Sequence, residues 1–523
     1  MRVQFAGRLF VLSFTLSLIH PGVGQAAERP MTLDEAISLA LEHNEGIVIE
    51  REQLASAESE VTGAKGAYDP LLQLEGGWLR SRAPVNSAFS GAPAGALAPR
   101  IDSADAGASL RELLPTGGEI SVRGTASRGT TDGAFTLLSP AYATEAGVEL
   151  RQPLLRDRAI DPARFALRVT ASDRTRAVAS LSREVTDTIA AVEDAYWNLV
   201  ETRREVSVRE EAVGLAEQQL SETSQRIERG AAPETELSQP RAELERRRGE
   251  LWASREALAR AENGLKTLIL TDTDILWADP IDPTESPETT PPTVDVPASL
   301  KKALAARPEI AEAEAGLERR RAETDFAADG VKPALDLVIS YDAYGLGGSR
   351  NPAGATIPGL PTEVPDELQG GLGRSWATLG GGDFNDVRAG VVFQVPIGNR
   401  SAKAAAAVAR SARRQAQAEL ARARKTVRAE VLDAAAAVDT ASQRVEASRA
   451  AREAAEVQLS SEQERFAVGL STNFLVLTRQ NDLSRARLDE IAALIDYRKA
   501  RTEMARATGS LLEEHRIELG RQN

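Results

Sequence analysis

The chain has 523 residues, of which 42% are hydrophobic but only 4% aromatic, and its formal net charge is −14. This acidic balance disfavours nucleic acid as a partner, because binding to a phosphate backbone needs clustered cations. The chain has no cysteine, which excludes disulfide bonds and the acylated N-terminal cysteine of a lipoprotein.

The first residues have the pattern of a secretory signal peptide. Arg2 and Arg8 provide a positive start, Leu9 to Ile19 form an apolar stretch, and residues 24–26 form a small-residue cleavage site. We therefore assign residues 1–26 to a signal peptide and expect the rest of the chain to be exported. No later apolar run reaches the ~18 residues of a transmembrane helix.

The next segment, residues 27–270, combines helix and strand patterns. The predicted elements are a helix over about 32–66, strands over about 70–152, a long helix over 158–227 and a return helix over 234–269. Apolar residues recur at every seventh position from Val178 to Ile227, which is typical of a coiled coil. The long helix, of about 70 residues, would measure roughly 105 Å at 1.5 Å per residue. The return helix has only about 36 residues, so it retraces about half of this length.

After Pro70 the period of the pattern changes from seven to two. Leu72 and Leu74 alternate with Gln73 and Glu75. One apolar and one polar face over about ten residues is typical of a transmembrane β-strand. An ordinary half-buried antiparallel sheet would give the same alternation.

Two long segments rich in Gly, Pro and Ala interrupt the strands, at about 83–106 and 345–386, and we expect both to be loops. Residues 113–118 lie between two strand-like runs and indicate an extra hairpin.

Four strands, or six with this hairpin, are too few to close a membrane barrel. Since an open sheet edge is not tolerated in lipid, subunits must share the barrel.

The same order of elements recurs after residues 271–297, which are rich in proline and are predicted to be an extended linker. In residues 298–510 we expect a helix, strands over about 334–396, a long helix over 399–466 and a return helix over 472–509. Arg226–Gly230 aligns with Arg465–Gly469 at a spacing of 239 residues. This predicts an internal duplication followed by a C-terminal tail over 511–523.

The return helix of the second repeat carries its own apolar seam. Leu470, Phe474 and Leu477 begin a series with alternating steps of four and three that extends to Ile495. The fold class is therefore predicted to be mainly α with a β-barrel: a long antiparallel coiled-coil helical tunnel joined to a shared transmembrane β-barrel.

The sequence resembles the outer membrane efflux protein family, of which TolC is the familiar member. The resemblance covers essentially the whole mature chain and is carried by Thr32–Ala36, Gln152–Arg156, Ala305–Ile310, Pro396–Ile397 and the two turns between long and return helices. It implies a TolC-like homotrimer with a twelve-stranded barrel in outer-membrane lipid and a twelve-helix periplasmic tunnel. It also implies a periplasmic adaptor (membrane fusion) protein and an inner-membrane pump of RND, ABC or MFS type, or a type I secretion system.

The resemblance further implies that the two turns dock on the adaptor. The residues concerned are Arg226, Gly230, Arg465, Gly469, Leu470 and Ser471. The two glycines would also supply the positive φ angles that a helix–helix turn needs, and both roles can hold at once.

Residues just past the turns resemble the family's periplasmic gate. Glu236 matches an acidic gate position and Phe466 an aromatic one, whereas Leu475 and Thr478 stand where some members carry aspartates. Pro240 is a further departure, since it fits the first turn of a helix or kinks the return helix.

No residue pattern indicates catalysis. Of the three histidines, His20, His43 and His515, none has a second ligand at metal spacing, and no phosphate-binding loop or nucleophile elbow is present. We expect no enzyme activity, no cofactor and no metal. The expected function is efflux transmembrane transport: an exit duct for small molecules or polypeptides, located in the cell outer membrane and extending into the periplasm. The alternative is a structural or adhesive coiled-coil protein of the cell surface.

Overall fold

A computed structural model describes residues 28–84, 91–93, 96–230, 233–287, 294–355 and 363–517. The expected signal peptide and the end of the expected tail lie outside these ranges. The chain forms two compact units. The helical unit comprises Met1–Ser56, Thr175–Ala315 and Ala418–Asn523, and the sheet unit comprises Ala57–Arg174 and Gly316–Gln417.

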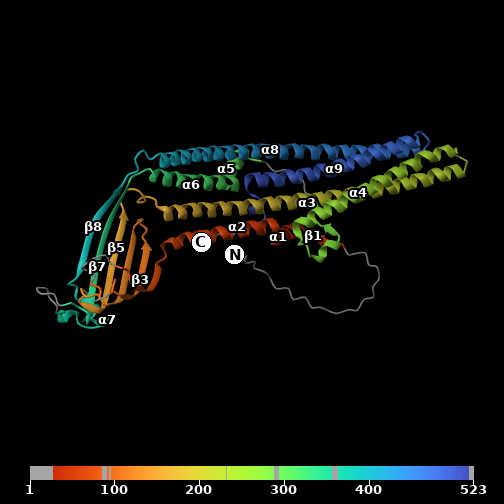
Figure 1. Ribbon diagram of the computed structural model, residues 1–523. Coiled ribbons are helices and arrows are strands. Elements are labelled where there is room, and N and C mark those ends of the chain that lie inside the picture. The colour runs from red at the N-terminus through yellow and green to blue at the C-terminus, as the bar shows by residue number, and fades with distance from the viewer. Residues whose placement is uncertain are drawn as a thin grey trace, which may run out of the picture. The chain divides into compact units, whose positions relative to one another are not determined.

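Helices dominate the described residues (Figure 1). Two of them are very long, and each is followed by a shorter helix that runs back beside it. The bounds are α1 (Leu33–His43), α2 (Glu45–Lys65), α3 (Pro162–Glu228), α4 (Ser238–Ile269), α5 (Val296–Ala306), α6 (Pro308–Asp329), α8 (Arg400–Ala467) and α9 (Asn473–Thr508).

The single helix expected over 32–66 is divided in two at Asn44. The Asn44 backbone is extended, with ψ at 123°. Its side-chain oxygen accepts hydrogen bonds from the backbone N–H groups of Gly46 (2.9 Å) and Ile47 (3.3 Å). An asparagine that caps the next helix in this way competes with continuation of the first. The matching helix of the second half is likewise interrupted at Arg307, because the following proline disfavours α geometry there.

The linker expected to be extended is partly structured. A short 3₁₀ turn spans Ile275–Ala278 and is capped by the Asp274 side chain. Strand β6 (Ile281–Pro283) then pairs in parallel with β1 (Arg29–Met31). A three-residue strand is too short to show periodicity in a sequence, so the pattern could not reveal this pairing.

The main core of the helical unit lies where α1, α3 and α4 meet. The heptad positions Val185, Val192 and Leu199 are buried there, as the seven-residue pattern predicts. Tyr196 is also fully buried, and its hydroxyl donates a hydrogen bond to the Met31 carbonyl at 3.0 Å. This bond satisfies the one polar atom of the ring inside an apolar core.

The sheet unit contains a six-stranded antiparallel sheet in the order β2-β3-β4-β5-β7-β8. The hairpin β3–β4 is the extra one indicated around residues 113–118, and it lies between β2 and β5. The strands are β2 (Leu71–Ser81), β3 (Ile101–Leu113), β4 (Glu119–Thr131), β5 (Leu138–Pro153), β7 (Ala334–Arg350) and β8 (Asn385–Gln394).

The expected loop at 345–386 is wrong in part. Strand β7 continues to Arg350, and a helix, α7 (Leu372–Gly381), lies inside the same region. The segment is rich in glycine, which weakens any strand or helix signal in a sequence. Packing of α7 against β5 and β7 stabilises it in the tertiary structure.

The two faces of the sheet differ sharply in polarity. One transverse row crosses all six strands with exposed apolar side chains: Leu72, Leu110, Val122, Val148, Tyr341 and Val387. The neighbouring row points to the opposite face and contains no large apolar residue: Gln73, Ser109, Arg123, Gly147, Asp342 and Asp386. Arg123 forms ion pairs there with Glu145 (3.1 Å) and Asp342 (2.6 Å).

Candidate functional site: the turns between long and return helices

The turn between α8 and α9 is built around Gly469. Its φ of 79° lies in the left-handed region. The Gly469 N–H donates to the Phe466 carbonyl (3.0 Å), and the Leu470 N–H donates to the Arg465 carbonyl (2.8 Å). These two bonds are the Schellman closure of a helix C-terminus, which glycine permits without strain. The Thr472 side chain then caps the start of α9.

The turn after α3 also has glycine at its reversal point. Gly230 has a φ of 72°, and its N–H donates to the Ile227 carbonyl at 2.8 Å. Residues 231–232 lie outside the described ranges. A 3₁₀ turn over Glu234–Leu237 then leads into α4, and the predicted gate residue Glu236 is exposed in it. Pro240 falls within the first turn of α4, a position that proline tolerates.

Two of the predicted docking residues share one carboxylate. The Ser471 hydroxyl donates a hydrogen bond to Glu462, and the Arg465 guanidinium lies 3.7 Å from the other oxygen of the same side chain. Glu462 is buried. No sequence pattern indicates this residue, because its link to Ser471 crosses the turn and is not periodic.

A cation–π contact joins α3 to α8 near the turns. The Arg226 guanidinium lies over the Phe466 ring at 5.5 Å from the ring centre. Phe466 also packs against the small core formed by Leu459, Val476 and Leu483. The structure therefore brings together a predicted docking residue and a predicted gate residue.

The α8–α9 turn presents an apolar surface to solvent. Val468, Leu470 and Phe474 are 69%, 71% and 60% exposed. The expectation that Leu470 and Phe474 begin the buried seam of the return helix is wrong. The seam starts at Val476 and Leu477, because residues at the reversal of a helix pair project beyond the opposite helix.

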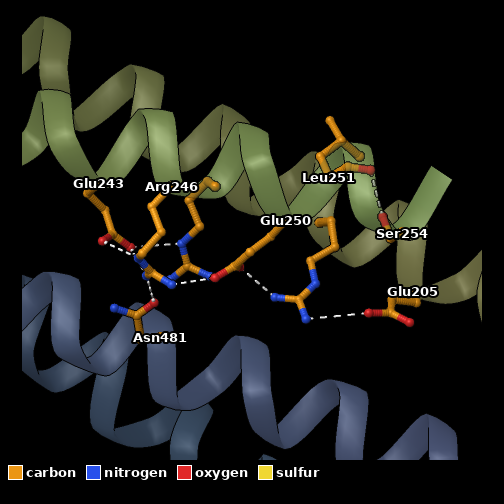
Figure 2. Close-up of polar contacts among 9 residues, drawn as sticks. Glu205, Glu243, Arg246, Glu250, Leu251, Ser254 and Asn481 are labelled. Carbon is orange, nitrogen blue, oxygen red and sulfur yellow. Dashed lines mark hydrogen bonds and ion pairs between the residues drawn. The ribbon is translucent and has the colours of Figure 1, made fainter. Parts of the chain in front are cut away.

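Farther along the pairs, a charged network links α4 to α9 (Figure 2). Arg246 forms ion pairs with Glu243 and Glu250 on its own helix and donates to the Asn481 side-chain oxygen at 3.0 Å. Burial raises the pKa of Glu243, but its bonds to Arg246 and Arg247 outweigh burial, so the net shift is downward. The carboxylate therefore stays ionised and holds Arg246 toward α9.

A second link joins α9 to α3. The Arg487 guanidinium lies 2.7 Å from the Glu211 carboxylate and 3.7 Å from Glu456 on α8. A cavity of about 160 Å³ lies beside these links, and Arg247, Leu477 and Arg487 are among its lining residues. The two helix pairs are thus joined here largely by polar contacts around an incompletely filled space, which costs less to open than a close-packed core.

The described part of the chain contains no group of three or more His, Cys, Asp or Glu residues that could hold a metal ion. Among the same residues, no helix combines the length and apolar character needed to span a membrane.

Residues 299–510 match the model of the outer membrane efflux protein family. The match confirms the predicted recognition and the expected outer-membrane location. Comparison with curated protein sequences gives no match.

Solved structures share the fold of this chain. A membrane protein from Pseudomonas aeruginosa is 18% identical with a TM-score of 0.62, and the match covers 91% of this chain and 90% of that one. The CmeC outer membrane channel of Campylobacter jejuni is 15% identical with a TM-score of 0.62, over 93% and 90%. The open MtrE outer membrane channel of Neisseria gonorrhoeae is 16% identical with a TM-score of 0.58, over 92% and 89%. The chain therefore has a TolC-like fold, mostly helical with sheets, and the family that matches residues 299–510 and the CmeC and MtrE neighbours are outer-membrane channels or efflux proteins.

Proposed function

We propose that the protein is the outer-membrane exit duct of a tripartite efflux pump or type I secretion system, and that it acts as a homotrimer. The observation that carries the proposal is the exposed apolar row across all six strands, backed by a polar row on the other face. Exposed apolar surface of this extent is unfavourable in water and suits lipid.

The sheet must close to be stable in a membrane. Among the described residues, β2 and β8 each pair on one side only. An open edge leaves backbone N–H and C=O groups unpaired in lipid, at several kcal/mol for each group. Closure between copies, with β2 of one chain against β8 of the next, removes both edges.

Each chain contributes six strands, which changes the strand number of the barrel that the family resemblance implies. Three six-stranded sheets contribute eighteen strands, not the twelve that the resemblance implies. Because barrel diameter rises roughly in proportion to strand number, we propose a wider outer pore. The charged face with Arg123, Glu145 and Asp342 would line it.

Neighbouring residues of β3 provide a matched test of membrane insertion. Ala108 lies on the apolar face and Ser109 on the polar face. Ala108→Arg places a cation toward lipid near mid-membrane, which costs about 2–4 kcal/mol, whereas Ser109→Arg places the same cation toward the lumen. We expect Ala108→Arg to abolish assembly into membranes and Ser109→Arg to assemble with altered single-channel conductance. Equal membrane assembly of both variants would contradict the barrel.

Docking on a periplasmic adaptor is proposed for the apolar surface at the α8–α9 turn. Photo-crosslinking from probes at Leu470 and Ser471 in intact cells should capture an adaptor and its pump. A probe at Val457, which is 71% exposed on α8 away from the turn, is the control for random capture. Equal capture from Leu470 and Val457 would reject docking at the turn and would favour the structural coiled-coil alternative.

Opening of the duct is proposed to separate the helix pairs at the links around Arg226, Arg246 and Arg487. Each link joins one helix pair to the other, so each must break if the pairs move apart. Exposed polar links contribute only about 0–1 kcal/mol each, which partner binding can supply. We place Phe466 at the gate on the same reasoning, and Glu236 there because it lies just past the turn after α3.

A further inference from the structure

Helix α7 rests on the apolar face of the sheet, near the start of β5 and the end of β7. The Thr144 hydroxyl donates to the Ser375 carbonyl at 3.1 Å, and both side chains are buried. Two glycines of β7 make room for the helix. A Cβ at Gly345 would collide with the Ser375 carbonyl oxygen, and one at Gly347 would lie 2.9 Å from the Ser375 nitrogen.

The part of the sheet that α7 packs against belongs to the apolar face described above. Gly345 and Gly347 lie on the same side of β7 as Tyr341 and Ile339, because side chains alternate along a strand. Thr144 likewise shares its face of β5 with Val148. The helix therefore lies on the side that faces lipid if the sheet forms a membrane barrel.

The outer side of α7 is itself apolar. Leu372 and Trp376, one helical turn apart, are 42% and 46% exposed. The helix has no acidic residue, and its single charge is Arg374. A helix that turns tryptophan and leucine away from its protein support, with few charges, is typical of a segment at a lipid boundary.

The depth of α7 agrees with such a boundary. Gly345 lies about eleven residues beyond Ala334, the first residue of β7. At ~3.3 Å per residue and a tilt of ~40°, this corresponds to roughly 28 Å along the membrane normal. The apolar band of outer-membrane barrels is about 25 Å tall and ends in aromatic girdles. Trp376 would lie at the outer rim of this band.

We propose that α7 is an interfacial helix that binds the lipid surface of the outer leaflet, with Leu372 and Trp376 in the acyl–headgroup boundary and Arg374 at the headgroups. The proposal rests on the outer-membrane barrel proposed above. It gives each chain a second contact with lipid, outside the strands. Continuity with the apolar sheet face favours lipid over a second copy of the chain as the occupant.

Site-directed spin labelling tests the proposal directly, since the chain has no native cysteine. Single cysteines replace three exposed tryptophans: Trp376→Cys on α7, Trp78→Cys on the apolar face of β2, and Trp252→Cys on α4. Each spin-labelled full-length protein is reconstituted into phospholipid vesicles. Collision with lipid-soluble oxygen is compared with collision with a water-soluble nickel complex. Leu372→Cys provides a second probe should Trp376→Cys fail to fold.

The expected result is that labels at positions 376 and 78 collide mainly with oxygen, whereas the label at position 252 collides mainly with nickel. Nickel-dominated collisions at position 376, with oxygen-dominated ones at position 78, would overturn the α7 proposal and leave the barrel intact. The α7 proposal would also be overturned if the label at position 376 were shielded from both reagents and its spectrum were broadened by a second label nearby. That result would indicate a contact between two copies of the chain. Nickel-dominated collisions at positions 78 and 376 together would overturn both the barrel and the α7 proposal.

Discussion

Gly469 sets the reversal of the α8–α9 pair through its backbone alone. A Cβ added there would meet no atom within 4 Å, so steric fit with neighbours does not require glycine. The requirement comes from the φ of 79°, which an L-residue with a side chain adopts at a cost. At the residue scale, the effect of a substitution therefore depends on backbone geometry more than on contacts.

We expect Gly469→Ala to lower the free energy of unfolding by about 1–2 kcal/mol, the cost of a left-handed residue. Gly249 also has open space around it, but it lies inside α4 with helical geometry. Gly249→Ala should therefore stabilise the protein by about 0.5–1 kcal/mol. Denaturant unfolding followed by circular dichroism measures both. Shifts of the same sign would contradict a backbone origin of the effect.

His515 provides a pH-dependent contact for the C-terminal end of the helical unit. It ends the short helix α10 (Leu511–Glu514), and its Nε2 lies 2.5 Å from the Glu193 carboxylate. Asp34 is 3.7 Å from the other ring nitrogen. The hydrogen bond to Glu193 raises the pKa of His515, and the charges of Glu193, Asp34 and Glu514 act in the same direction, against burial.

A raised pKa means that folding favours the protonated imidazole. The stabilisation is complete below the unfolded value of about 6.5 and is lost as pH rises through the higher folded pKa. We therefore expect the protection of the α10 amides against hydrogen exchange, corrected for intrinsic rates, to fall at alkaline pH. His515→Gln should remove this dependence. An unchanged dependence in the variant would assign it to another group.

At the scale of elements, the links between helix pairs differ from the links within a pair. Arg246 and Arg248 lie two positions apart on α4, and the side chains of both are about half exposed. Arg246 reaches Asn481 on α9, whereas Arg248 reaches Glu217 on α3 within its own pair. Only the first contact would break if the two pairs separate.

We expect Arg246→Ala to increase the open probability of the reconstituted channel and Arg248→Ala to leave it near the wild-type value. Both variants lose one exposed arginine, so a general charge effect would appear equally in both. The stability loss should stay within about 1 kcal/mol for each. Planar-bilayer recordings measure the opening, and equal behaviour of the two variants would exclude Arg246 as a specific link.

At the scale of the whole molecule, the open edges of the sheet determine how copies must associate. Leu72 lies on edge strand β2, and Val387, Ala389 and Val391 lie on edge strand β8, all on the apolar face. Because the chain has no cysteine, each introduced pair reports only on the contact between those strands.

We expect Leu72→Cys, combined in turn with a cysteine at each of the three β8 positions, to give one strongly cross-linked register. Denaturing gels should then show a ladder that ends at three chains. The single-cysteine variants are the controls. A ladder that ends at two chains would replace the trimer with a dimer, and no cross-link in any register would contradict closure between β2 and β8.

The features that repeat along the chain could be predicted from the amino-acid sequence alone. The seven-residue spacing placed Val185, Val192 and Leu199 in a buried helix seam, and the two-residue alternation marked the sheet strands. The glycines of both turns could also be identified, because positive φ restricts the choice of residue. Periodicity and backbone restriction are local properties, so they can be read without knowledge of the fold.

Contacts between residues that are far apart in the sequence became known from the three-dimensional fold. Arg246 and Asn481 are 235 positions apart, and Thr144 and Ser375 are 231 positions apart. Neither pair has a spacing that a local pattern could reveal. Packing between remote segments likewise determines the exposure of Phe474, the position of α7 on the sheet and the position of the β3–β4 hairpin. A side chain's neighbours across a fold depend on the whole path of the chain, whereas its periodic face depends only on the residues beside it.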